Sequence, residues 1–288
     1  MEEITSNILV ETSFNGVTIG AILTPKGVIM IDLPLRAKDI QSWQSACLRA
    51  CDGSDRMLIL LDEHPDRTAS ADQVRCPILT HEKTALAITS NPAVVKMQGL
   101  ETGAVWETIP EICSFDWPSP EITFTESTII NWMDEPILVE HHPGPSKGSA
   151  WVILPDQKVA FIGDTITPGQ PPFFASANIE LWLASIEDLK SARFKDFILI
   201  SGRGKLATKD DIRFAQRFIK KANRAFERLY SQKADIEKAE QTGRGYIDDF
   251  KLKNKAHQEL FLSRLGYGFG KYHARQFNRN QQSKSDQA

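Results

Sequence analysis

The stretch Leu60 to Thr68, LLDEHPDRT, places several ionisable side chains directly after an apolar run. Among them are Asp62, His64, Asp66 and Arg67, together with Glu63. Carboxylate oxygens and imidazole nitrogens are ligands for divalent cations, so these residue types at this spacing fit a metal site. The alternative is a charged turn at a strand end, in which the aspartates cap the next helix and the arginine pairs with a carboxylate.

The segments before this stretch alternate between strand and helix patterns. NILVET, VTIGAIL and GVIMIDL read as strands, and the turn at residues 24–27 makes the last two a hairpin. Ile40, Trp43 and Cys47 recur at helical spacing, and RMLILLD is a short apolar run typical of a buried strand. The charged stretch is therefore expected at the end of a strand.

The rest of the chain continues the alternation. Strands are expected at CPILT, EITFTESTIINWMD, PILVEHHPG, SAWVILP, KVAFIGDT and DFILIS, and helices at HEKTALAITS, IELWLASIEDLKSARF and KNKAHQELFLSRL. The Pro-rich residues 91–120 are left unassigned. We expect residues 1–207 to form an α/β domain, 208–270 a helical extension packed on it, and 271–288 a disordered tail.

A long helix is predicted over about residues 209–233 because apolar residues alternate there at spacings of three and four. The stripe consists of Ile212, Ala215, Ile219, Ala222, Phe226 and Leu229. Such a stripe covers an apolar surface. We expect it to dock on the domain's own sheet, with pairing to a second copy in a homodimer as the alternative.

Four segments in order resemble the metallo-β-lactamase-fold hydrolases, the superfamily that includes glyoxalase II. They are GVIMIDLP, LILLDEHPDRTASADQVRCPILTHEK, HHPGPSKGSAWVILPDQKVAFIGDTI and DFILISGRGKL. The resemblance implies a four-layer αβ/βα sandwich. It also implies a centre at which two metal ions share a bridging hydroxide, bound by His-x-His-x-Asp-His, by a histidine in Gly-His-Thr-Pro-Gly-Ser, by a Gly-Asp carboxylate and by Gly-His-Gly.

This sequence departs from the family's ligand pattern at several positions. His64, Asp66 and Asp164 stand where the family has ligands of the same type, and Asp62 replaces a histidine as a substitute ligand. The other three ligand positions carry Arg67, Pro145 and Arg203. Proline has no ligating side chain, and a fixed guanidinium disfavours a nearby cation.

The two arginines suggest an Arg-carboxylate cluster with Asp66 and Asp164 in place of a metal. A sharper alternative is that Arg67 and Arg203 bind an anionic ligand, although three aspartates against two arginines leave no surplus of positive charge. We therefore expect a non-catalytic or atypical member without a cofactor, which binds a small-molecule ligand or a protein partner. The alternative is a single-metal hydrolase of an ester, thioester or phosphoester, with zinc, manganese or iron on Asp62, His64 and Asp164 and with Asp66 as the base.

Composition excludes several other classes. The 288 residues are 41% hydrophobic and 25% charged with a net charge of -3, which is the composition of a globular protein without an overall basic field for nucleic acid. No apolar run is long enough to cross a bilayer, and the acidic start MEEITSNILVETSF lacks a secretory pattern. We expect a cytoplasmic protein that binds neither membrane nor nucleic acid.

Overall fold

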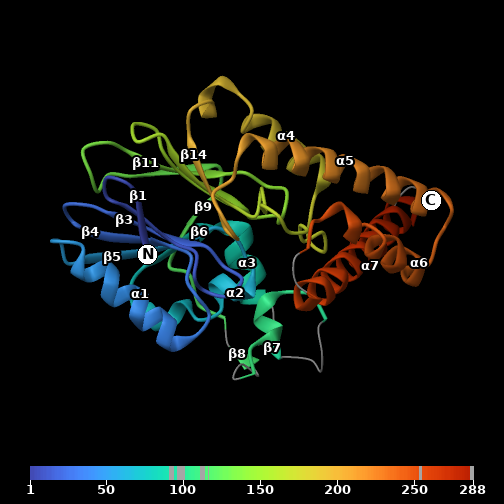
Figure 1. The fold of residues 1–288 in the computed structure, drawn as a ribbon, viewed down its shortest axis with the longest axis horizontal. Helices are drawn as coiled ribbons and strands as arrows, with labels where there is room; N and C mark the ends of the chain where they lie inside the picture. The colour runs from blue at the N-terminus through green and yellow to red at the C-terminus, as the bar shows by residue number, and fades with distance from the viewer. Residues whose placement is uncertain (91–93, 96–100, 111–113, 116, 253–254, 286–288) are drawn as a thin grey trace.

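Two β-sheets pack face to face in this computed structural model, which describes residues 1–90, 94–95, 101–110, 114–115, 117–252 and 255–285 (Figure 1). The first sheet has the strand order β1-β2-β3-β4-β5-β6-β9 and the second the order β10-β11-β12-β13-β14. The first comprises β1 (Glu2–Thr5), β2 (Ile8–Glu11), β3 (Ile19–Leu23), β4 (Gly27–Ile31), β5 (Asp55–Leu60), β6 (Ile78–His81) and β9 (Ile122–Phe124). The second comprises β10 (Ser127–Ile130), β11 (Ile137–His141), β12 (Ala150–Leu154), β13 (Val159–Gly163) and β14 (Ile198–Ser201).

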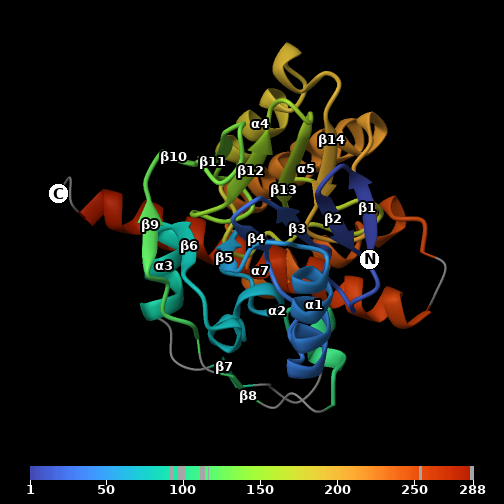
Figure 2. The same ribbon diagram turned by 90° about the vertical axis from the view of Figure 1, so that its left-hand side faces the viewer.

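Helices α1 (Ala37–Arg49) and α3 (Glu82–Ser90) lie on the outer face of the first sheet, and α4 (Ile179–Asp188) and α5 (Lys209–Ser231) on that of the second (Figures 1 and 2). The other described α-helices are α2 (Pro65–Thr68), α6 (Ile236–Arg244) and α7 (Lys255–Ser285). The 3-10 turns η1 (Ala71–Val74), η2 (Val105–Thr108), η3 (Ala192–Phe194) and η4 (Ile247–Asp249) and the short pair β7 (Val94–Val95) and β8 (Ser114–Phe115) complete the described elements. The result is the predicted four-layer αβ/βα sandwich.

Three apolar layers hold the sandwich together. Ile29, Ile59 and Val152 belong to the layer between the two sheets. Trp43 of α1 packs in a second layer on the outside of the first sheet, and Trp182 of α4 packs in a third on the outside of the second sheet. Strands β4, β12 and β13 are apolar and buried throughout because both of their faces are covered, and β5 is buried over its last three residues.

Strand pairing brings the ends of chemically important strands together. The predicted hairpin forms, with Leu23 opposite Val28 in antiparallel β3 and β4. The pairs β4–β5, β5–β6 and β13–β14 are parallel. The loops that follow β4, β5, β13 and β14 can therefore meet at one end of the sandwich, as in other α/β folds whose sites lie at the carboxyl ends of strands.

One predicted strand was wrong. EITFTESTIINWMD does not form a single strand, because β9 pairs with β6 in the first sheet whereas β10 pairs with β11 in the second. The chain changes sheets between Phe124 and Ser127, where the carbonyl of Glu126 accepts a hydrogen bond from the backbone N–H of His141. The local sequence of this segment does not reveal such a crossing.

The apolar stripe of α5 packs against other residues of the same chain. Ile212, Ile219, Ala222, Phe226 and Leu229 are buried in the layer that also contains Trp182. The helix begins with a capping box, in which the side chains of Thr208 and Asp211 each accept a hydrogen bond from the backbone N–H of the other residue.

The C-terminal region is more helical than predicted. Helix α6 was not predicted, and α7 continues far beyond the expected short helix, through Ser285. The expectation of a disordered tail from residue 271 fails for residues 271–277, because they are helical and Tyr272 and His273 are buried. No helix in the described ranges combines the length and apolarity needed to span a membrane.

Candidate functional site

A cluster of charged residues lies where four strands end. Asp32 follows β4, Asp62 follows β5, Asp164 follows β13 and Arg203 follows β14, whereas Asp66 and Arg67 belong to the short helix α2. All six are at most 3% exposed, so the cluster is almost dry. We call Asp32, Asp62, Asp66, Asp164, Arg67 and Arg203 the Arg-Asp cluster.

Arg67 bridges two carboxylates that come from different sheets. Its Nη1 donates to Oδ1 of Asp164 at 2.8 Å, and its Nη2 donates to Oδ2 of Asp62. Its Nε lies 3.5 Å from Oδ2 of Asp32, as an ion pair longer than an ordinary hydrogen bond. Local folding fixes the arginine, because the backbone N–H of Leu33 donates to the Arg67 carbonyl at 3.2 Å.

Arg203 connects Asp164 to α2. Its Nε lies 3.1 and 2.9 Å from the two oxygens of Asp164. Its Nη1 and Nη2 each donate to one oxygen of Asp66, the second at 3.0 Å, and Nη1 also donates to the Gly16 carbonyl at 3.0 Å. Both oxygens of Asp66 thus accept from one guanidinium in the bidentate arrangement that arginine favours.

Gly202 is required for the close approach of Arg67 to the end of β14. A Cβ on Gly202 would lie 1.8 Å from Nη1 of Arg67 and 3.1 Å from Oδ1 of Asp164. Any side chain at this position would displace the Arg67 guanidinium. The SGRG sequence therefore provides both Arg203 and, at Gly202, the space that Arg67 occupies.

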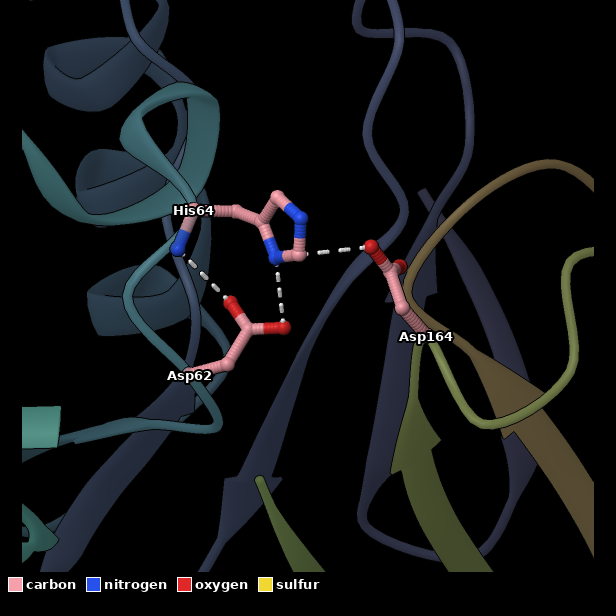
Figure 3. A group of neighbouring side chains, drawn as sticks. All are labelled: Asp62, His64 and Asp164. Carbon is pink, nitrogen blue, oxygen red and sulfur yellow. Dashed lines mark hydrogen bonds and ion pairs between the residues drawn. The ribbon is translucent and has the colours of Figure 1, made fainter. Parts of the chain in front are cut away.

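His64 lies beside the cluster and precedes α2 (Figure 3). Its Nδ1 is 2.9 Å from Oδ2 of Asp62 and 3.6 Å from Oδ2 of Asp164, and its backbone N–H donates to Oδ1 of Asp62 at 3.0 Å. These three residues each offer one ligand atom within 4.8 Å of the others. In the described part of the chain, Asp62, His64 and Asp164 are therefore the group that could hold one metal ion.

The charges shift the pKa values in the directions expected for a buried network. Burial raises the pKa of Asp62, but Arg67 and His64 outweigh it and hold the pKa below its usual range. Burial also raises the pKa of Asp164, but Arg203 and Arg67 outweigh it and lower the pKa to about 2. For Asp32, burial outweighs the attraction of Arg67 and raises the pKa to about 7. Burial lowers the pKa of His64, but Asp62 and Asp164 raise it above its ordinary value.

The sequence did not predict Asp32, Phe173 or Arg264 as parts of this region. The centroid of the Phe173 ring lies 4.7 Å from the guanidinium carbon of Arg203, 4.1 Å from that of Arg264 in α7, and 5.0 Å from the centroid of the His64 ring. Asp32 directly follows the apolar strand GVIMI, and this position at a strand end could have indicated that it belongs to the site. Arg264 interrupts an apolar helical segment, and its partners lie far away in the sequence, so no local pattern indicated its role.

Helix α7 thereby covers the strand-end region. Nε of Arg264 donates to the Gly103 carbonyl at 2.9 Å, and Nη1 donates to Oε1 of Gln170 and to the Pro171 carbonyl, both at 3.0 Å. These acceptors are neutral, and burial together with the charge of Arg203 lowers the pKa of Arg264 to about 9. The extension is therefore linked to the Arg-Asp cluster through Phe173.

The two histidines nearest to Pro145 in sequence are held by other partners. The His141 ring stacks on His81 at 3.8 Å between centroids, and its Nε2 lies 2.9 Å from the Lys147 carbonyl. The His142 ring stacks on Trp151 at 3.5 Å. Neither histidine belongs to the metal-competent group of Asp62, His64 and Asp164.

Comparison with known proteins supports the resemblance read from the sequence. Residues 61–199 match the family model described as the metallo-beta-lactamase superfamily. This segment contains the loop after β5 and the loop after β13, which carry Asp62 and Asp164. No curated protein matches the chain at a significant level.

Solved structures show the same fold. A metallo-beta-lactamase from Pontibacter korlensis aligns with a TM-score of 0.60 and 17% identity, covering 76% of this chain and 97% of that one. The DIM-1 metallo-beta-lactamase aligns with a TM-score of 0.61 and 16% identity, covering 77% and 96%. TMB-1 aligns with a TM-score of 0.60 and 15% identity, covering 77% and 97%. The chain is a metallo-β-lactamase-fold protein with an additional C-terminal helical region.

Proposed function

We propose that this protein is an atypical member of the superfamily in which the Arg-Asp cluster takes the place of the two-metal centre, and that it works by binding a ligand or partner. The observation that carries the proposal is the Arg67 guanidinium, which bridges Asp62 and Asp164. In the resembling hydrolases the corresponding Asp164 position bridges two metal ions. Here a permanent cation from the chain itself neutralises that carboxylate.

The donor set does not fit two metal ions. Asp164 accepts from both arginines, and Asp66 gives both of its oxygens to Arg203. A second metal ion would need these oxygens while lying next to guanidiniums that cannot lose their charge. Buried like charges at such distances repel strongly, so a metal ion could enter only if an arginine moved out.

The charge balance also argues against an anionic ligand inside the cluster. Four carboxylates face Arg67 and Arg203, and an Asp32 with a pKa near 7 keeps part of its proton at neutral pH. Within the Arg-Asp cluster, Arg67 and Arg203 thus leave no surplus of positive charge to attract phosphate or carboxylate. The cluster is better suited to fix the strand-end loops that carry it, and a ligand or partner would meet the surface that those loops form.

Elemental analysis tests the proposal directly. The full-length protein would be purified without chelator or metal-affinity tag, offered zinc, manganese or iron(II), and analysed for bound metal beside its His64→Ala variant. We expect far less than one metal ion per chain and no rise in the melting temperature. A metal bound only to the native state at about 100 times its Kd would add about 2.7 kcal/mol to the free energy of unfolding. Two bound ions per chain would refute the proposal.

A second candidate function is hydrolysis with one metal ion, favoured by the geometry of Asp62, His64 and Asp164. A metal ion bound there would polarise a carbonyl or phosphoryl group. Its weakness lies in the base, because both oxygens of Asp66 are already held by Arg203. One metal ion per chain, lost in His64→Ala, together with ester or phosphodiester hydrolysis lost in the same variant, would establish this candidate instead.

A further inference from the structure

A cavity unrelated to the Arg-Asp cluster opens between the end of α4 and the start of α5. Its volume is about 520 Å³, within the range of about 300–1,000 Å³ that is typical of small-molecule sites. We call it the α4–α5 pocket, and its lining includes Ser191, Lys195, Leu199, Ala207, Lys209 and Ile212. It shares no residue with the Arg-Asp cluster, so the inference is independent of the proposed function.

The wall of the α4–α5 pocket is apolar. Leu199 of β14 and Ile212 of α5 lie on it together with Phe197 and Ala207. Strand β14 is the edge strand of its sheet. The Leu199 carbonyl on its free edge already accepts a hydrogen bond from the backbone N–H of Ala207 at 2.8 Å. An extended peptide cannot add to the sheet at this carbonyl, which favours a compact ligand over a strand.

The rim of the pocket is cationic. The described lining includes Lys190, Lys195, Lys209 and Arg213 and contains no aspartate or glutamate. Lys190 pairs with Glu187, and Arg213 pairs with a carboxylate in its own helix. Lys195 and Lys209 make no ion pair with any residue that the structure describes. Two positive charges are thus left for a ligand.

Ser191 adds a polar group to the lining of the pocket. Its Oγ is buried and makes no hydrogen bond among the described residues, although the residue lines the pocket. A buried hydroxyl without a partner is unfavourable, and an oxygen-bearing ligand head could accept its hydrogen. The pocket therefore combines an apolar wall, two unpaired lysines and a hydroxyl donor.

We propose that the α4–α5 pocket binds an amphipathic monoanion of the alkyl carboxylate class. Its chain lies along Leu199, Ala207 and Ile212, and its carboxylate lies between Lys195 and Lys209 within reach of Ser191. The apolar chain supplies most of the binding free energy, as in most small-molecule sites, whereas the lysines select for the charged head.

Isothermal titration of the full-length protein with sodium decanoate tests this proposal. Decanol, which has the chain without the charge, and acetate, which has the charge without the chain, are the matched ligands. We expect saturable binding of one decanoate per chain and at least tenfold weaker binding of both other ligands. Equal affinity for decanol and decanoate would overturn the proposal, as would no decanoate binding up to its solubility limit.

Three variants locate the site. Lys195→Ala/Lys209→Ala is expected to weaken decanoate binding by about tenfold. Lys220→Ala/Lys238→Ala removes two exposed lysines outside the pocket and is expected to leave binding unchanged. Ala207→Phe fills the cavity and is expected to abolish binding. An equal loss in both lysine pairs would overturn the assignment, even if Ala207→Phe proved too unstable to study.

Binding to macromolecules provides the remaining control. The protein and its Lys195→Ala/Lys209→Ala variant would be sedimented with anionic phospholipid vesicles and titrated with an acidic peptide. Weak binding that is unaffected by the substitutions is the expected result. Vesicle or peptide binding that depends on these lysines, without decanoate binding, would reassign the surface to a membrane or protein partner and overturn the small-molecule proposal.

Discussion

Replacing Arg203 with methionine is expected to destabilise the fold strongly. The side chain is fully buried, donates to both oxygens of Asp66, to Asp164 and to the Gly16 carbonyl, and lies over the Phe173 ring. Methionine retains most of the apolar stem but none of the donors. Removing one partner of a buried ion pair costs about 3–5 kcal/mol, because the other charge is left uncompensated. That is a large part of the ~5–15 kcal/mol by which domains are stable.

The loss of unfolding free energy in Arg203→Met should also depend on pH. In the native protein burial raises the pKa of Asp164, but Arg203 and Arg67 outweigh it and bring the pKa down to about 2. Arg203→Met removes one of these two cations, so the pKa of Asp164 is lowered less in the folded variant. A carboxyl whose pKa is lowered on folding contributes stability that is present above its unfolded pKa and is lost as pH falls toward its folded pKa. The deficit of the variant should therefore be greater at pH 7 than at pH 3.

Urea unfolding at both pH values measures these effects. Arg193→Met is the matched control, since Arg193 forms a bidentate pair with Glu140 but its side chain is 41% exposed, and such pairs contribute at most about 1 kcal/mol. In Arg203→Met/Asp66→Asn the uncompensated charge is gone, and part of the stability should return. A loss below about 1 kcal/mol for Arg203→Met, or a double variant less stable than the single one, would refute the reasoning.

Three further outcomes follow from the described contacts. Thr208→Ala removes the capping box of α5 and should cost about 1 kcal/mol of unfolding free energy in urea titrations. Gly103→Ala should loosen α7 and increase its cleavage in limited proteolysis, because φ is +70° there and a Cβ would lie 2.3 Å from the backbone nitrogen of Arg264. The unfolding free energy of the native protein should fall as pH decreases from about 4 toward 2, because Asp164 has a lowered pKa and its contribution is lost as it protonates; an unchanged urea midpoint over that range would contradict this.

The sequence predicted the elements whose pattern is local. Ile40, Trp43 and Cys47 are buried in α1 as their helical spacing indicated, and the hairpin between β3 and β4 has the expected turn. Helix α6 was not predicted because residues 236–244 contain polar residues and a glycine and show little continuous apolar periodicity. The crossing of the chain from β9 to β10 also depends on pairing with distant strands, which no local pattern encodes.

The site could be predicted only in part, for a similar reason. Motif order placed Asp62, Asp66, Asp164, Arg67 and Arg203 in one region because each follows or adjoins a strand end. Which arginine would bind which carboxylate depends on side-chain geometry across two sheets. The participation of α7 depends on how a helix more than fifty residues after β14 docks, and the sequence contained no signal for that contact.

An arginine reproduces only one property of a metal ion in this fold. It neutralises carboxylates at the ends of strands from both sheets, and Arg67 and Arg203 do so for Asp62, Asp66 and Asp164. A guanidinium offers only hydrogen-bond donors and has no coordination position at which water or substrate could exchange. Two-metal hydrolysis needs that exchangeable position, whereas holding the loops in place needs only the charge. Arg67 and Arg203 therefore supply the positive charge that holds the strand-end loops together, but they supply no exchangeable position for a substrate.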